Sequence, residues 1–253
     1  MSFRAIRILF LLTLLAAVAG MTYWESMVVR NWLRPLEVTI YPVNGDDTAE
    51  VGEYIAALKQ DHFQEIGRFI AGQSERYRGK DLPPVSIRLA REIRTPPPFP
   101  PQDRHSGFSA ILWSLKLRHY AFDHTPFWDS LGTVRLFVVY HQGEDGKPLQ
   151  HSLGLHKGLV GVVHAFAQAK QNAQNNVVIT HELFHALGAS DKYDAANQPL
   201  YPEGFGDPDG PRYPQHVAEI MAGRIAVAPE VARIPAGLEA CVVGYKTAWE
   251  INW

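Results

Sequence analysis

Blocks of apolar residues alternate with polar stretches along the chain and predict strands and helices in turn. Residues 36–43 are apolar and rich in β-branched side chains, and a turn signal at residues 44–46 follows them, which predicts a first strand. Apolar residues recur at helical spacing over residues 48–78, with an interruption near residue 61. Apolar and polar residues then alternate over residues 85–93, which predicts a second strand.

The alternation of strand and helix continues through the middle of the chain. Five prolines in residues 95–101 predict an extended surface connector. Residues 108–122 predict a helix, and residues 134–140 predict the strongest strand because β-branched and aromatic side chains dominate them. Residues 158–166 predict a further strand, whose glycines favour a position at the sheet edge. This order of elements predicts an α+β fold with an α/β-like sheet.

The composition changes after residue 194. Proline, glycine, aspartate and tyrosine crowd residues 195–215, which predicts a loop-rich C-terminal lobe. We therefore divide the chain into an N-terminal segment with its connector, residues 1–35, and a domain over residues 36–253. The lobes of that domain are predicted at residues 36–190 and 191–253.

The N-terminal segment has the layout of an export signal or a membrane anchor. Arg4 and Arg7 precede an apolar run over residues 8–21, and Tyr23 and Trp24, which suit a membrane interface, follow it. The seventeen residues from 8 to 24 are at the short limit for spanning a bilayer, and the small residues Ala-Val-Ala within the run offer a cleavage pattern. Both alternatives, an uncleaved anchor and a cleaved signal, predict that the remaining domain is extracytoplasmic.

Overall composition excludes several classes of protein. The chain has 253 residues, of which 46% are hydrophobic and 20% charged, so it is not a disordered protein. Its net charge is −2 and it contains no long basic run, so nothing supports a nucleic-acid partner. The single cysteine, Cys241, cannot form a disulfide within the chain or a thiolate cluster, and its apolar neighbours predict a core residue. Any metal site must therefore use histidine, aspartate and glutamate.

The third helix predicted from the pattern carries the candidate chemistry. Asn175 and Asn176 are predicted to cap it, and the apolar residues 177–179 follow them.

The helix contains the motif His181-Glu182-x-x-His185-x-x-Gly188-x-x-Asp191. His181 and His185 are one helical turn apart on the same face, where they can bind one metal ion, and Glu182 lies beside them. Gly188 can adopt a left-handed conformation that ends the helix and turns the chain, which would bring Asp191 to the metal as a third ligand. Three protein ligands and one open position are the arrangement of catalytic zinc.

This motif resembles that of the metzincin clan of zinc peptidases. The branches with aspartate as the third ligand, the snapalysin and immune-inhibitor-A types, are the most similar. Residues 191–194, Asp-Lys-Tyr-Asp, resemble the continuation of the motif in the second of these types. Residues 219–223, Glu-Ile-Met-Ala-Gly, resemble the methionine turn that lies beneath the metal, with Met221 as its methionine. The resemblance extends over residues 176–223.

The resemblance implies a metzincin-like zincin, with a mixed twisted sheet and helices in the N-terminal lobe, an active-site helix and a smaller C-terminal lobe. It implies one catalytic Zn²⁺ bound by His181, His185 and Asp191, with Glu182 as general base. It also implies an endopeptidase that acts on peptide or protein substrates. We expect an extended peptide to pair with the strand over residues 160–167.

One position departs from the family pattern. Several branches have a tyrosine two residues after the methionine, where it assists the oxyanion, and this chain has Gly223 there. Tyr193 and Tyr245 are the candidates to replace it.

Other side chains compete for the role of third ligand. Glu219 would take it if it lay on a later helix, as in gluzincins, and His216 and Asp194 are nearby alternatives. His164, in the predicted edge strand, either faces the cleft or is an ordinary core or surface histidine.

Two alternatives to peptide hydrolysis stay open at this point. A zinc-containing domain without hydrolytic activity could recognise a peptide or a component of the cell envelope, although it would not need Glu182. A zinc amidase could act on a non-peptide envelope substrate. The sequence predicts no oligomeric state.

Overall fold

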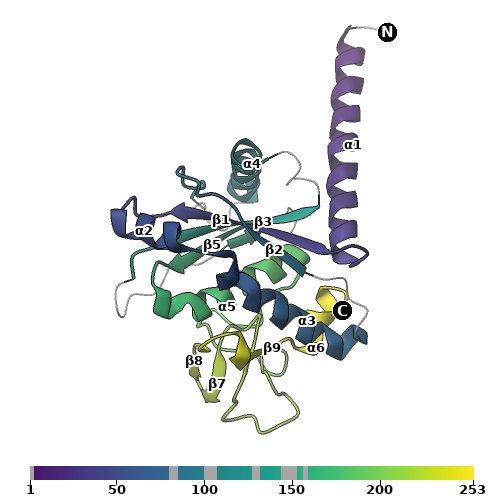
Figure 1. Ribbon diagram of the computed structural model, residues 1–253. Helices are drawn as coiled ribbons and strands as arrows, with labels where there is room; N and C mark the ends of the chain where they lie inside the picture. Colours follow the sequence, from purple (N-terminus) through teal and green to yellow (C-terminus); the bar gives the residue numbers. More distant parts are fainter. Residues whose placement is uncertain (1–2, 80–84, 100–106, 127–131, 144–152, 156–158) are drawn as a thin grey trace.

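A five-stranded sheet with helices on both faces forms the centre of the computed structural model, which describes residues 3–79, 85–99, 107–126, 132–143, 153–155 and 159–253 (Figure 1). The strands are β1 (Leu36–Asn44), β2 (Val85–Leu89), β3 (Thr133–His141), β4 (Leu153–Leu155) and β5 (Val160–Phe166). Their order is β2-β1-β3-β5-β4, and all neighbouring pairs are parallel except β4 with β5. This mixed, mainly parallel sheet confirms the predicted α+β class with an α/β-like sheet.

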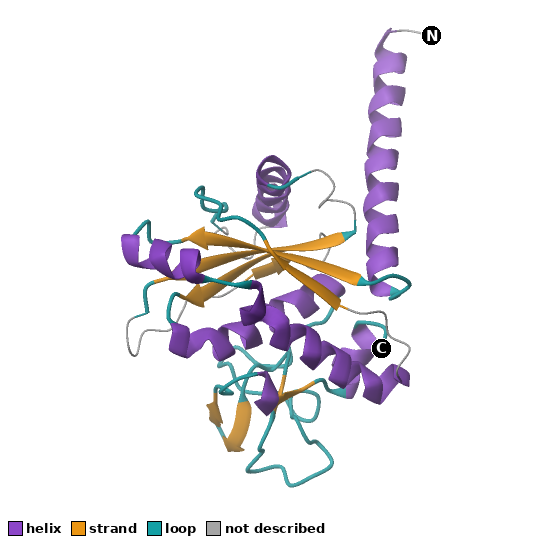
Figure 2. Ribbon diagram, viewed as in Figure 1, coloured by secondary structure: helices purple, strands orange, loops and turns teal. Residues whose placement is uncertain are grey.

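The helices divide between the two faces of the sheet (Figure 2). One face is covered by α2 (Ala49–Ala57), α3 (Gln64–Arg78) and α5 (Asn172–Leu187), and the other by α4 (Gly107–His124). β3 is buried along most of its length because both of its faces are covered. Alternate residues of β5 enter different cores: Val163 packs with the α5 side, whereas Val162 packs with Leu117 of α4.

The predicted break in the first helical region is confirmed. The short 3₁₀ helix η1 (Gln60–Phe63) separates α2 from α3, and it buries Phe63 in the core. Thr48 caps α2, since its hydroxyl accepts a hydrogen bond from the backbone N–H of Val51 at 3.4 Å.

Two predicted strands need correction. The strand predicted over residues 85–93 ends at Leu89, and Ile93 returns to the sheet only as an isolated bridge to Val43. The strand predicted at an edge, β5, lies inside the sheet between β3 and β4, so the edge of the described sheet on that side is β4. Gly161 has a packing role there: a Cβ on it would lie 2.9 Å from Leu136 of β3.

The N-terminal helix α1 (Phe3–Arg30) projects from the body of the molecule, and only its C-terminal end packs on the domain (Figure 1). Val29 and Trp32 belong to the main core, and the indole N–H of Trp32 donates to the carbonyl oxygen of Ile251 at 2.7 Å. Residues that precede the predicted domain boundary at Leu36 thus contribute to the core of the domain. Among the described residues, no helix reaches the length and apolarity needed to cross a bilayer.

The C-terminal region has little regular structure, as its composition predicts. Cys241 is buried, which confirms the prediction of a core residue. The remaining elements are η4 (Ala169–Gln171), β6 (Ala218–Glu219), β7 (Ile225–Ala228), β8 (Val231–Arg233), η5 (Leu238–Ala240), β9 (Cys241–Val242) and α6 (Tyr245–Glu250).

Candidate metal centre

The helix α5 is joined to the sheet at its N-terminal end by asparagine side chains. Asn175 accepts a hydrogen bond from the backbone N–H of Phe166 at 3.1 Å and donates to its carbonyl oxygen at 2.9 Å. Asn176 donates to the carbonyl oxygen of His62 at 2.9 Å. Because α5 begins at Asn172, neither asparagine is the predicted cap, and both instead fix the helix against its neighbours.

The C-terminal end of α5 follows the prediction. Gly188 adopts the left-handed conformation with φ of 112°, and its N–H bonds to the carbonyl oxygen of His185 at 3.0 Å. The positive φ of Gly188 would strain any residue with a Cβ, and such a Cβ would also lie 2.7 Å from an Arg30 Nη atom, which would have to shift.

The turn at Gly188 brings three potential ligand atoms together. His181 Nε2 and His185 Nε2 are 3.0 Å apart. Asp191 Oδ1 lies 3.3 Å from the first of these nitrogens and 3.0 Å from the second. The edges of a tetrahedron of ligands at about 2.0 Å from zinc measure about 3.3 Å, so the three atoms have the spacing that a zinc ion requires.

The protonation of the two imidazoles also suits a cation. His181 Nδ1 lies 2.9 Å from the carbonyl oxygen of Ile220, and His185 Nδ1 lies 2.9 Å from that of Ala189. Because a carbonyl oxygen only accepts, we assign the ring proton to Nδ1 in both residues, which leaves both Nε2 atoms as bare acceptors. When both imidazoles are neutral, two lone pairs and a carboxylate oxygen converge at this point, and a bound cation would remove their repulsion.

The carboxyl group of Asp191 is strongly affected by the two histidines. Burial raises its pKa, but hydrogen bonds and charge interactions with His181 and His185 outweigh burial and hold the pKa well below its usual range. Asp191 is therefore ionised at neutral pH, as a ligand to zinc must be.

A buried ion pair that the sequence did not predict holds the segment carrying Asp191. Lys192 Nζ lies 2.8 Å from Glu250 Oε2, and the same carboxylate accepts hydrogen bonds from the backbone N–H of Ser190 at 2.9 Å and from its hydroxyl at 2.8 Å. The backbone N–H of Lys192 donates to the carbonyl oxygen of Met221 at 3.0 Å. Asp191 thus lies between two residues whose positions are fixed by distant parts of the chain.

Glu182 has the environment of a reactive carboxyl group. It is only 3% exposed, and its Oε2 atom has no hydrogen-bond partner among the described residues. Burial raises its pKa to about 7, while the charge of His185 lowers it and that of Asp191 raises it. With His181 and His185 it forms a compact group in which one ligand atom from each residue lies within 4.8 Å of the others.

Glu219 is not a metal ligand, which corrects one alternative from the sequence. Its carboxylate accepts hydrogen bonds from the backbone N–H groups of Met221 at 2.6 Å, Ala222 at 3.1 Å and Gly244 at 3.1 Å. Burial raises its pKa, and these N–H groups oppose that shift. Glu219 therefore shapes the turn that carries the buried Met221 and presents the carbonyl oxygen of Ile220 to His181.

The other proposed ligands have different surroundings. Asp194 Oδ1 accepts from the backbone N–H groups of Ala196 and Gln198, both at 2.9 Å, and so stabilises a turn. His216 is exposed, and it does not belong to the group of potential ligands that His181, Glu182 and His185 form in the described residues.

The two tyrosines considered for the oxyanion differ in position. The ring of Tyr193 stacks near that of His181, with centroids 6.2 Å apart. Tyr245 is 77% exposed on α6. Tyr193 is therefore the tyrosine adjacent to the candidate centre.

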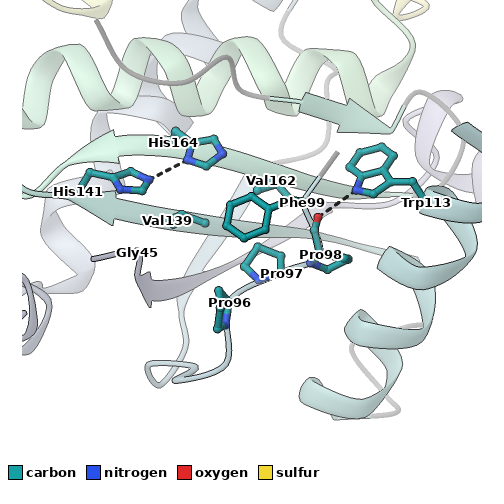
Figure 3. Close-up of a pocket in the computed structure, with 10 residues that line it drawn as sticks. All are labelled: Gly45, Pro96, Pro97, Pro98, Phe99, Trp113, Val139, His141, Val162 and His164. Atoms are coloured by element: carbon teal, nitrogen blue, oxygen red, sulfur yellow. Dashed lines mark hydrogen bonds between the residues drawn. The ribbon is translucent and has the colours of Figure 1, made fainter. Parts of the chain in front are cut away.

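His164 is not part of the metal centre. It shares the face of β5 with Val162, on the α4 side of the sheet, where the two line an apolar pocket with Trp113 (Figure 3). His164 Nδ1 is 2.9 Å from His141 Nε2, and His141 Nδ1 is 2.6 Å from Asp46 Oδ1, so a hydrogen-bonded chain crosses the ends of three strands. Burial, aided by the neighbouring His141, lowers the pKa of His164 to about 4.

No protein-family model matches the chain, and no curated protein matches it. The candidate centre is therefore defined by its own residues. The structure brings together His181, Glu182, His185 and Asp191, and it gives Glu219, Asp194 and His164 other hydrogen-bond partners. The support that Glu250 gives to Ser190 and Lys192 carried no local signal, because these partners are 60 and 58 positions apart in the sequence.

Proposed function

We propose that the chain is a zinc-dependent peptidase of metzincin-like architecture. The observation that carries the proposal is the convergence of two bare imidazole nitrogens and an ionised carboxylate. Beside them lies the buried Glu182, whose Oε2 atom has no hydrogen-bond partner in the described part of the chain. A site made only for structural zinc would have four protein ligands, whereas His181, His185 and Asp191 leave a position open for reaction.

When bound, Zn²⁺ supplies Lewis acidity towards the scissile carbonyl and makes water acidic enough to react near neutral pH. His181, His185 and Asp191 would hold the ion, and the carbonyl oxygens of Ile220 and Ala189 keep the two imidazoles in the required tautomer.

Glu182 has the role of general base in this proposal. Its carboxylate removes a proton from the attacking water and returns it to the leaving amine as the carbon–nitrogen bond breaks. Its burial keeps bulk water away from this proton. Tyr193, beside His181, is the candidate to donate a hydrogen bond to the oxyanion.

The architecture also supports the metzincin-like assignment. The left-handed Gly188, the early third ligand Asp191 and the turn containing the buried Met221 have the arrangement that the sequence resemblance implies. In the same proposal the basic and apolar N-terminal segment directs the domain out of the cytoplasm, either as an anchor or as a cleaved signal.

The test combines metal analysis with one isosteric substitution. We expect about one zinc per chain in the wild type, and loss of zinc in His185→Ala and in Asp191→Ala. Glu182→Gln should retain zinc, because Glu182 is not a ligand, but should lose about 10²–10⁴-fold in the rate of cleavage of a mixed peptide library.

The other outcomes separate the alternatives. Retention of zinc with full affinity in Asp191→Ala would refute the three-ligand centre. Zinc binding without cleavage of any peptide by the wild type would support a binding domain or an amidase for non-peptide substrates, and equal cleavage by wild type and Glu182→Gln would exclude Glu182 as the base.

A further inference from the structure

The C-terminal end of α1 is built into the domain, unlike the rest of that helix. In the described part of α1, the exposed large apolar side chains lie between Phe3 and Met27. Val29 and the following Trp32, by contrast, are only 6% and 3% exposed. Figure 1 shows α1 reaching the domain at this end, near the C-terminus. We call residues 29–32 the docking turn, because they join the projecting helix to the core.

Hydrogen bonds tie the docking turn to the C-terminal end of the chain. The indole N–H of Trp32 donates to the carbonyl oxygen of Ile251 at 2.7 Å. The side-chain amide of Asn252 donates to the carbonyl oxygen of Arg30 at 3.2 Å. Trp32 has a φ of 52°, in the left-handed region that a residue with so large a side chain seldom adopts. Such a conformation persists only when surrounding contacts fix it, so the C-terminal residues hold the docking turn in one conformation.

A row of aromatic rings leads from the docking turn to the helix α5. The rings of Trp32 and Trp253 have centroids 5.7 Å apart. The ring of Trp253 meets that of Phe184 edge-on, also with centroids 5.7 Å apart. Phe184 is fully buried and lies inside the candidate motif, between Glu182 and His185. The position of Trp32 therefore affects the position of the helical turn that carries two of the candidate ligands.

The backbone around Phe184 links this packing to the orientation of a candidate ligand. The carbonyl oxygen of Phe184 accepts a hydrogen bond from the backbone N–H of Ala189 at 2.9 Å. The carbonyl oxygen of Ala189 in turn lies 2.9 Å from His185 Nδ1 and orients that imidazole. A shift of Phe184 would thus move the group that fixes the ring of His185.

Arg30 provides a second contact, at the residue that ends α5. Its guanidinium lies beside Gly188, since a Cβ built on this glycine would be 2.7 Å from one Nη atom. Gly188 has the left-handed conformation that turns the chain towards Asp191. Because the side chain of Arg30 fills the space beside this glycine, the turn cannot move towards α1 without a clash.

We infer that the docking turn positions the metal-binding helix and the turn that follows it. Trp32, through Trp253, holds Phe184 in place. Arg30 holds the turn at Gly188, so the candidate ligands before and after it keep their spacing. Trp32 and Arg30 act through other residues and are therefore positioning residues. The inference rests on the proposed function for the metal that is bound, and it adds the docking turn to the functional domain.

The inference also restricts how the N-terminal segment can be processed. Cleavage of a signal at the small residues 17–19, Ala-Val-Ala, leaves the docking turn in the mature protein. Cleavage beyond Trp32 would remove it. An exported form with an intact metal centre therefore retains residues 29–32.

The experiment compares variants of the full chain that each lose one buried aromatic ring. Trp32→Ala removes the ring of the docking turn. Phe137→Ala is the matched control, because Phe137 is a buried residue of β3 in the separate core on the α4 side of the sheet. Competition with a chromogenic chelator should show zinc binding about tenfold weaker in Trp32→Ala and unchanged in Phe137→Ala. Both affinities are measured under conditions where urea unfolding shows the two variants to be folded.

Two further measurements separate positioning from stability. The visible spectrum of Co²⁺ bound in place of zinc reports the geometry of the ligands, and we expect it to change in Trp32→Ala but not in Phe137→Ala. Trp32→Phe keeps a ring against Trp253 and should recover most of the zinc affinity. Arg30→Ala uncovers Gly188 without emptying the core, and it should weaken zinc binding by a smaller factor than Trp32→Ala.

Hydrogen exchange of the chelator-treated protein tests the inference without the metal. In Trp32→Ala we expect the amides of residues 181–190 to exchange faster than the lost free energy of unfolding accounts for, and in Phe137→Ala we expect no such excess. If the wild type binds no zinc, the proposed function fails, and this measurement still decides the inference. Equal excess exchange in the two variants, or equal zinc affinities, would overturn it, because Trp32 would then contribute to stability in the same way as Phe137.

Discussion

The ion pair between Lys192 and Glu250 gives the sharpest prediction about how the candidate metal centre is supported. The side chain of Lys192 is 3% exposed and that of Glu250 is 12% exposed, and their charged atoms are 2.8 Å apart. The substitution Glu250→Ala leaves the ammonium of Lys192 buried, and of its partners in the described residues it retains the carbonyl and hydroxyl oxygens of Ser190.

Removing one member of a buried ion pair costs about 3–5 kcal/mol, and the slight exposure of Glu250 favours the lower end, about 3 kcal/mol. For a chain of this size, such a loss lowers Tm by roughly 6–12 °C. The double variant Lys192→Met, Glu250→Leu removes both charges and replaces them by apolar groups, so it should recover most of the lost stability.

Two assays separate stability from metal binding. Urea unfolding of the chelator-treated protein measures the free energy of unfolding without zinc, and competition with a chromogenic chelator measures zinc affinity. We expect Glu250→Ala to weaken zinc binding as well, because Ser190 and Lys192 on either side of Asp191 lose their common partner.

The effect should depend on pH with a definite sign. Burial raises the pKa of Glu250, but hydrogen bonds from Lys192 and Ser190 outweigh it and hold the pKa below its usual value. A carboxyl group with a depressed pKa in the folded state contributes stability above its unfolded pKa of about 4.3, and that stability is lost as the pH falls through the folded value. The reasoning is refuted if Glu250→Ala costs less than about 1 kcal/mol at pH 7, or if the double variant is as unstable as the single one.

Two further predictions concern other parts of the fold. Gly188→Ala should lower the free energy of unfolding by about 1–3 kcal/mol, measured in urea, and should weaken zinc binding, because φ at this position is 112° and the new Cβ would meet Arg30. The matched control is Gly72→Ala in α3, where the new Cβ would enter open space, and it should leave the stability unchanged or raise it slightly. His164 has a pKa of about 4 in the folded state against about 6.5 unfolded, so between these values the unfolded chain binds more protons and stability falls as the pH falls. This dependence should be absent from His164→Phe, and an unchanged stability profile between pH 7 and pH 4 in the wild type would contradict the buried neutral histidine.

Local features of the chain were predicted from the sequence because they depend on neighbours within one helical turn or one strand. The i, i+4 spacing of His181 and His185 places both on one side of α5, and Gly188 ends that helix as its lack of a Cβ allows. The break near residue 61 and the strands β1 and β3 were predicted in the same way, from periodicity and turn residues.

The tertiary structure decided what depends on contacts between distant segments. From the sequence, Glu219 could be either a metal ligand or a hydrogen-bond acceptor within a turn. The pairing of β6 with β9 decides its role, because it brings the backbone N–H groups of Met221 and Gly244 to the carboxylate. The position of β5 inside the sheet likewise depends on β4, whose three residues pair antiparallel with it.

The same limit applies to the candidate metal centre. Its four candidate residues lie within eleven positions of the sequence, and their proximity was predicted because their spacing is set by one helix and one turn. The groups that orient them lie outside the motif: the carbonyl oxygen of Ile220 is 39 positions from His181, and the side chain of Glu250 is 60 positions from Ser190, so only tertiary packing brings them to it. Sequence spacing therefore determined which residues form the candidate metal centre. The tertiary structure determined the tautomers of its histidines, the charge environment of its carboxyl groups and the contacts that hold them in place.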